Sequence, residues 1–117
     1  MKRINTHQLG IEQGSILLFS DFQDGGAMWT GTGPREMRRV VEFGESFAAV
    51  PAVHVSLSML DIDQATNHRV DISAELVTND DFVIVFRTWG DTRVARVRAD
   101  WTAMGAVRHE DDWDLEA

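Results

Sequence analysis

Apolar and polar residues alternate along much of this chain, a pattern typical of strands with one buried face. The alternation is clearest in 52–61, where four apolar residues share one face: Val53, Val55, Leu57 and Met59. The same period occurs in 69–78, 82–88 and 92–103, and shorter β-branched or aromatic runs occupy 16–19 and 38–43. We therefore predict six strands and no amphipathic helix.

The connections between these strands indicate how they are arranged. The turn at 79–81 and a four-residue corner join the last three strands, which favours antiparallel pairing. The glycine-rich stretch 24–33 is predicted to be a long loop. Two packed antiparallel sheets would bury the alternating faces. The predicted fold is an all-β, six-stranded antiparallel β-sandwich, with Trp101 in its core.

The sandwich is expected over 14–105, with an N-terminal extension over 1–13 and an acidic tail over 106–117. Five of the 19 acidic residues of the chain fall in 109–117. Such a tail is usually solvated, although Trp113 and Leu115 leave open a docking segment. The outer strand faces carry alternating charges that are either solvated or part of a subunit interface: Asp71, Glu75, Arg96 and Arg98.

Composition limits the functions that the chain can have. Its 117 residues suit one domain, and the lack of cysteine excludes disulfides and thiolate metal sites. A net charge of −8 argues against nucleic-acid binding. No apolar stretch approaches the ~20 residues that cross a bilayer, and 1–13 lacks the apolar segment of a signal peptide. We expect a cytoplasmic protein, unless it is exported without a signal peptide or associates with a surface or particle.

A series of short motifs between Val40 and Gly105 resembles the H-type lectin domain of snail agglutinins and discoidins. The motifs occur in the family's order: Phe43 and Phe47, 51–56, Asp61 and Asp63, 67–69, Val77 and Thr78 with Phe82, Thr88 and Trp89, Asp91 and Thr92, and Trp101. Short bacterial members also share the sequence of 19–22 and the acidic ending.

The resemblance implies a six-stranded β-sandwich that assembles as a parallel homotrimer, sometimes stacked into hexamers. It also implies recognition of galactose or N-acetylgalactosamine at clefts between protomers, without a metal or cofactor, and a part in cell adhesion.

Arg69 is the first candidate for sugar binding. It opens the fourth predicted strand directly after a loop, and its guanidinium presents a rigid fork of hydrogen-bond donors. It also matches the sugar-contacting arginine of the family. The alternative is a salt bridge to Asp61 or Asp63 that tethers the loop.

Trp89 is the second candidate, because an indole at a strand end can offer its face to a pyranose and its N–H to a hydroxyl. It too matches a family position. The alternative is that Trp89 packs across a subunit interface or covers one end of the sandwich.

Two departures weaken the resemblance at this site. Gly90 stands where the agglutinins have a sugar-contacting histidine, and Thr32, near Thr30, stands where they have an aspartate. Each missing hydrogen-bond partner costs about 1–3 kcal/mol. The candidate carbohydrate-binding residues are Arg69, Trp89, Thr32, Thr30 and Gly90.

Motifs of catalysis and metal binding are missing from the sequence. Asp61 and Asp63 are followed by Ala65 rather than by the ligands of a calcium loop. The four histidines have no metal-ligand spacing, and no nucleophile or phosphate-binding motif occurs. We therefore expect a binding protein rather than an enzyme. The two hypotheses are a homotrimeric glycan-binding module and an adaptor that keeps the lectin trimer but has lost the sugar.

Overall fold

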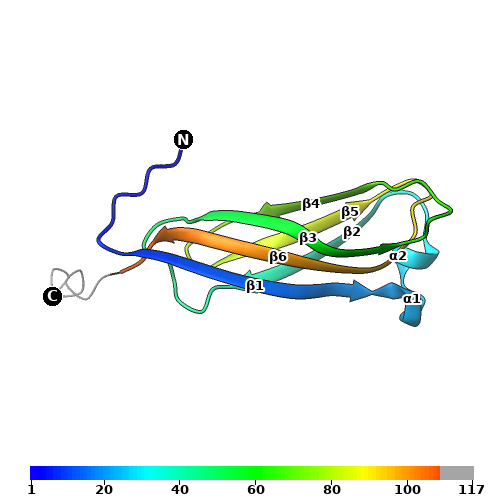
Figure 1. The fold of residues 1–117 in the computed structure, drawn as a ribbon, viewed down its shortest axis with the longest axis horizontal. Coiled ribbons are helices and arrows are strands. Elements are labelled where there is room, and N and C mark those ends of the chain that lie inside the picture. The colour runs from blue at the N-terminus through cyan, green and yellow to red at the C-terminus, as the bar shows by residue number, and fades with distance from the viewer. Residues whose placement is uncertain (109–117) are drawn as a thin grey trace.

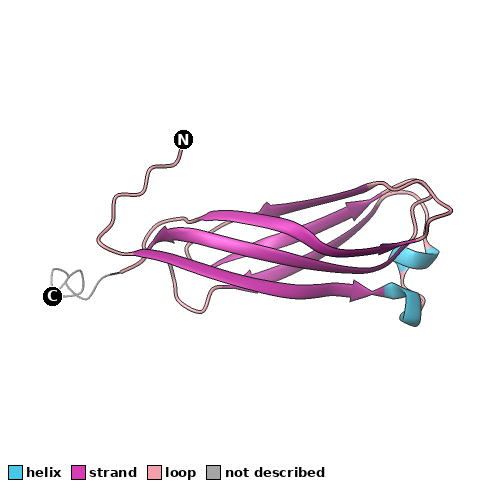
Figure 2. Cartoon of the chain, in the orientation of Figure 1, coloured by secondary structure: helices cyan, strands magenta, loops and turns pink. Residues whose placement is uncertain are grey.

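Two three-stranded antiparallel sheets pack face to face in the computed structural model, which describes residues 1–108 (Figures 1 and 2). One sheet has the order β1-β6-β3 and the other β2-β5-β4. The strands are β1 (Leu9–Ser20), β2 (Arg35–Glu42), β3 (Ala52–Ile62), β4 (Val70–Glu75), β5 (Asp81–Thr88) and β6 (Val94–Ala106). The predicted six-stranded antiparallel β-sandwich is confirmed.

β1 is much longer than the predicted strand over 16–19, and it begins inside the segment 1–13 that was expected to be an extension. It pairs with β6 along its length, from Leu9 opposite Ala106 to Ser20 opposite Arg96. The prediction was wrong because Gly14 suggested a break. A Cβ on Gly14 would lie 2.5 Å from Nε1 of Trp101, so this glycine marks a close approach within a strand.

The predicted loop over 24–33 is partly helical. Two single-turn helices, α1 (Asp21–Asp24) and α2 (Ala27–Thr30), are joined by Gly25 in the left-handed region. The Asp21 carboxylate accepts a hydrogen bond of 3.0 Å from the backbone N–H of Met28, whose side chain is buried. This segment is therefore packed onto the sandwich. Neither helix in the described part of the chain could cross a membrane.

The last three strands do not form one continuous antiparallel unit. β4 pairs with β5, but the turn over 89–93 carries the chain across the end of the sandwich, and β6 pairs with β1 and β3. The expected pairing of the fifth and sixth strands was thus wrong. β4 also ends at Glu75 rather than at Thr78, and the next residue, Leu76, has a positive φ of 51°.

The core lies between the inner faces of the two sheets. On β5, Phe82, Ile84 and Phe86 are fully buried. The ring of Phe82 lies 5.4 Å from that of Trp101 on β6 and 5.7 Å from that of Phe43. Trp101 therefore belongs to the core, as predicted.

The charged residues that were considered as one interface lie on opposite faces of the molecule. Arg96, on the outer face of β6, pairs with Asp61 at 3.0 Å. Asp71 and Glu75, on the outer face of β4, pair with Arg87 at 3.7 and 2.9 Å. The sequence could not show this separation, because strand alternation does not say which sheet a strand joins.

Gly14→Ala should lower the free energy of unfolding by about 1–3 kcal/mol, because the new methyl group would overlap the Trp101 ring. Gln13→Ala, at the neighbouring exposed position, should change it by no more than about 0.5 kcal/mol. Urea denaturation of both variants measures the difference. Equal midpoints would contradict the close approach of β1 to Trp101.

Candidate functional site

Three segments meet at the end of the sandwich where α1 and α2 lie (Figure 1). They are the helical segment 21–34, the loop 63–69 after β3 and the turn 89–93 between β5 and β6. The N–H of Gly33 donates to the carbonyl of Gly90 at 2.9 Å, and the N–H of Asp63 donates to the carbonyl of Arg93 at 2.9 Å. Main-chain hydrogen bonds thus fix both neighbouring segments to the turn.

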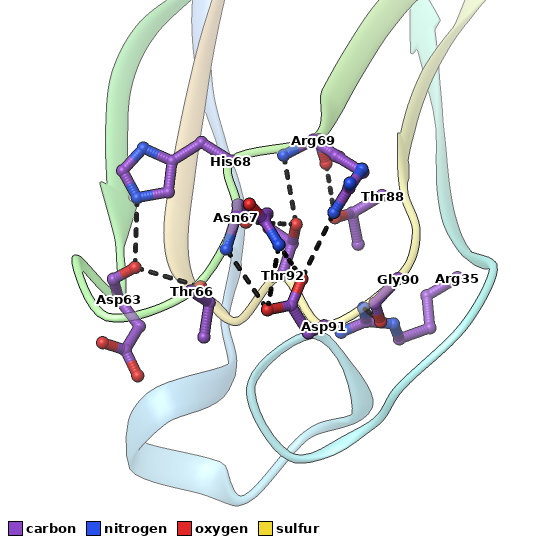
Figure 3. A network of polar contacts seen from close by, with 10 residues as sticks. All are labelled: Arg35, Asp63, Thr66, Asn67, His68, Arg69, Thr88, Gly90, Asp91 and Thr92. Carbon is purple, nitrogen blue, oxygen red and sulfur yellow. Dashed lines mark hydrogen bonds and ion pairs between the residues drawn. The ribbon is translucent and has the colours of Figure 1, made fainter.

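Two buried threonines hold the loop 63–69 against the turn (Figure 3). The Thr92 hydroxyl accepts from the N–H of Arg69 at 3.1 Å and donates to the carbonyl of Asn67. The Thr88 hydroxyl donates to the carbonyl of Arg69 at 2.6 Å. Because hydrogen bonds are stronger in a low-dielectric interior, these contacts fix the backbone from which the Arg69 side chain extends.

The Arg69 side chain pairs with Asp91, with Nη1 3.3 Å from Oδ1 (Figure 3). The Asn67 side chain donates to both carboxylate oxygens of Asp91, at 3.1 and 3.3 Å. These hydrogen bonds from Asn67, with a smaller contribution from Arg69, hold the pKa of Asp91 below its usual value. Arg69 and Asp91 remain about half exposed, so the guanidinium keeps donors that a ligand can reach.

The alternative in which Arg69 binds Asp61 or Asp63 is wrong in its partner. Asp63 pairs with Arg93 at 3.4 Å, and Asp61 pairs with an arginine of β6. The tether exists, but it runs to Asp91 across the turn.

Trp89 lies beside Arg69. The last register pair of β4 and β5 is Val70 opposite Thr88, so Arg69 and Trp89 are the next residues on the two neighbouring strands. The Trp89 side chain is 42% exposed. It lines an open pocket of about 390 Å³. The other lining residues are Pro34, Arg35, Glu36, Arg87 and Thr88.

Gly90 has a φ of 70°, in the left-handed region that favours glycine. A Cβ at this position would lie 3.2 Å from Nη1 of Arg69. The Arg69 side chain therefore lies over the place that a side chain at 90 would occupy.

The two threonines of the helical segment have different roles. Thr32 is exposed and precedes Gly33, which is bonded to Gly90, so it lies in the loop next to the turn. The Thr30 hydroxyl donates to the carbonyl of Gly26 at 3.0 Å and is engaged within α2. The structure thus brings Arg69, Trp89 and Gly90 together, with Thr32 adjacent and Thr30 in a local structural contact.

Arg35 is central to this end of the fold, and sequence reasoning missed it. It donates to the carbonyl of Gly33 at 2.9 Å, of Met28 at 3.1 Å and of Gly90 at 3.3 Å. Partial burial lowers its pKa. Arg35 directly follows a proline at the start of β2, where no periodic signal distinguishes it from a solvated arginine. Asp91 was also missed as a site residue, although it belongs to a matched motif.

The arrangement suits a polar, uncharged ligand with one apolar face. Arg69 supplies hydrogen-bond donors, and the Trp89 ring supplies a surface for C–H groups. Among residues 1–108, no three histidine or acidic side chains are placed to hold a metal ion.

The fold and the site define a β-sandwich domain with a candidate ligand site on the loops of one end. The H-type lectin domain matches residues 38–104, and the chain belongs to this family. The chain is 61% identical over 108 residues to "ATP synthase subunits region ORF 7" of Fuscovulum blasticum, covering 92% of this chain and 94% of that protein.

Discoidins of Dictyostelium discoideum are also similar. One discoidin-1 polypeptide of this organism is 36% identical over 81 residues, which is 68% of this chain and 32% of the discoidin. The structure of discoidin II matches 90% of this chain and 40% of its own, with a TM-score of 0.74 and 23% identity. This chain therefore corresponds to less than half of a discoidin. Family membership supports a lectin role, and the family and fold suggest a protein that is not an enzyme.

Asp91→Asn should reduce the free energy of unfolding at neutral pH, because the carboxylate is stabilised by its hydrogen bonds in the folded state. A depressed pKa stabilises the fold above the unfolded value, about 3.9 for aspartate, and this stabilisation is lost as pH falls through the folded pKa. The difference between the wild type and the variant should therefore shrink in acid. Urea denaturation over a pH series measures it, and a difference that is independent of pH would contradict the role of the charge.

Proposed function

We propose that this protein binds glycans of the galactose or N-acetylgalactosamine type, as a homotrimer with a shallow site at each subunit boundary. The observation that carries this proposal is the adjacency of Arg69 and Trp89 beside an open pocket. Sugar hydroxyls accept hydrogen bonds from a guanidinium, and the C–H face of a pyranose packs on an indole.

The position of these residues supports a site shared between protomers. Arg69 lies at the β4 edge of its sheet, whereas Pro34 and Glu36 lie at the β2 edge. A closed ring of three protomers uses two different surfaces of each. If the β4 edge of one protomer meets the β2 edge of the next, a ligand would contact Arg69 of one and Glu36 of the other.

Binding of a single sugar should be weak. Gly90 and Thr32 lack the side chains that agglutinins use, and each lost hydrogen bond costs about 1–3 kcal/mol. An affinity near millimolar, about −4 kcal/mol, follows for a monosaccharide. Three sites on one trimer raise the apparent affinity for a glycan-covered surface, because the second and third contacts are effectively intramolecular.

A second candidate function is a non-catalytic adaptor that keeps the trimer without sugar binding. It is favoured by the ion pair of Arg69 with Asp91, which already engages the main candidate donor. Such an adaptor would bind a protein partner through the loop end or the acidic tail. We expect no catalysis under either proposal.

The trimer is tested by light scattering. The chain has a mass of 13.2 kDa, and the expected result at micromolar concentration is three times that value. A monomeric mass would contradict the trimer and, with it, the shared site.

Arg69→Ala should lower binding to a surface coated with galactose or N-acetylgalactosamine by about tenfold or more, since a hydrogen bond from a charged group contributes about 1.5–3 kcal/mol. The melting temperature should change little. Arg96→Ala is the matched control, because Arg96 is similarly exposed, pairs with one aspartate and lies on the other sheet. It should leave binding unchanged.

Three outcomes oppose the glycan proposal. If wild type and both variants fail to bind, the adaptor is favoured. If Arg69→Ala unfolds the protein or breaks the trimer, Arg69 is a structural residue. If wild type and Arg69→Ala bind equally, the sugar site lies elsewhere.

A further inference from the structure

Exposed apolar side chains gather at the end of the sandwich opposite to the candidate site (Figure 1). Ile11 of β1 lies opposite Met104 of β6, which lies opposite Ala52 of β3, so one apolar row crosses the outer face of all three strands. Ile11 is 57% and Met104 is 38% exposed. Leu9 and Val50 are also exposed near this row. An apolar patch of this kind marks an interaction surface.

A basic segment lies beside the apolar row. The Lys2 ammonium donates to the carbonyls of Val50 and Pro51, each at 2.9 Å, and so holds the N-terminal segment against the start of β3. Lys2 and Arg3 line a pocket of about 280 Å³, together with residues at the end of β6. Among residues 1–108, neither Lys2 nor Arg3 forms an ion pair.

The chain leaves the described fold at this same end. The N–H of Val107 donates to the carbonyl of Gln8 at 3.2 Å, which fixes the exit point next to β1. Residues 109–117 lie outside the described residues and contain five acids with two apolar residues, Trp113 and Leu115.

The length of the segment is sufficient to reach the row. Five residues from Arg108 to Trp113 span at most about 17 Å. Met104 lies four strand residues before Arg108, a distance of about 14 Å. A segment that turns back after Arg108 can therefore bring Trp113 to Met104 and Ile11.

We propose that the acidic segment 109–117 docks on the apolar row and the basic segment of its own chain. Trp113 and Leu115 are two residues apart, so an extended conformation would direct both toward Ile11 and Met104. The acidic residues on either side of Trp113 would then approach Lys2 and Arg3. This inference does not depend on sugar binding.

Charge favours the chain's own tail over a second copy at this patch. Two copies that meet symmetrically at this end would bring Lys2 and Arg3 of one close to the same residues of the other. The tail instead supplies the opposite charge and an aromatic residue in one segment. A second copy is thus the competing occupant that an experiment has to distinguish.

The chain contains no cysteine, so a nitroxide label can be attached at one engineered position. In Ala117→Cys carrying the label, the amide NMR signals of 2–5, 9–12 and 102–104 should broaden strongly. The label on Gln23→Cys, at the other end of the molecule, should leave these signals sharp. Broadening confined to the residues next to Arg108 would overturn the proposal.

A mixture identifies the occupant. Isotope-labelled chain without nitroxide is mixed with unlabelled chain that carries it. Sharp signals are expected, because each tail covers its own chain. Broadening in the mixture would show that a second copy supplies the tail and would overturn docking within one chain.

Paired variants test the row itself. Ile11→Ser in the nitroxide-labelled chain should reduce the broadening severalfold. Leu17→Ser, at an equally exposed position on the same face of β1 but far from the row, should not change it. If Ile11→Ser fails to fold, Lys2→Glu combined with Arg3→Glu leaves every strand intact and should give the same loss. Unchanged broadening in both the Ile11 and the charge-reversal variants would overturn the proposal.

Discussion

The packing of β5 against β6 across the sandwich is the constraint on which the site depends. These are the central strands of the two sheets and are consecutive in the chain, so the turn over 89–93 has to span the sandwich. Their inner faces are almost completely buried, and the ring of Phe82 lies against that of Trp101. Interiors packed at this density resist displacement. The core therefore sets the position of the turn that carries Trp89 and Asp91.

Polar contacts extend this rigidity from the turn to the neighbouring loops. The buried hydroxyls of Thr88 and Thr92 hold the backbone around Arg69, and Arg35 joins carbonyls of the helical segment and the turn. The loops thus have little freedom to lose when a ligand binds, which lowers the entropic cost of binding. The same contacts explain how the chain orders a loop site without disulfides.

The two outer faces and the two ends of the sandwich differ chemically. On the β2-β5-β4 face, Arg87 pairs with Glu36, Asp71 and Glu75, and the hydrogen bond from Glu75 raises the pKa of Arg87. This charged lattice leads to the pocket beside Trp89. The opposite end has exposed apolar side chains next to a basic segment. A partner of the loop end and a partner of the other end must therefore differ in character.

The sequence by itself determined the fold class, because alternation of apolar residues is a local property of a half-buried strand. It also determined that Trp101 is buried, and motif order indicated the family. Tertiary structure decided the rest. Gly14 within β1, the split of β5 and β6 between sheets, and the partner of Arg69 all depend on contacts between residues far apart in the chain. Arg35 and Asp91 acquire their roles only through such contacts, since a hydrogen bond to a distant carbonyl or side chain leaves no periodic trace in the sequence.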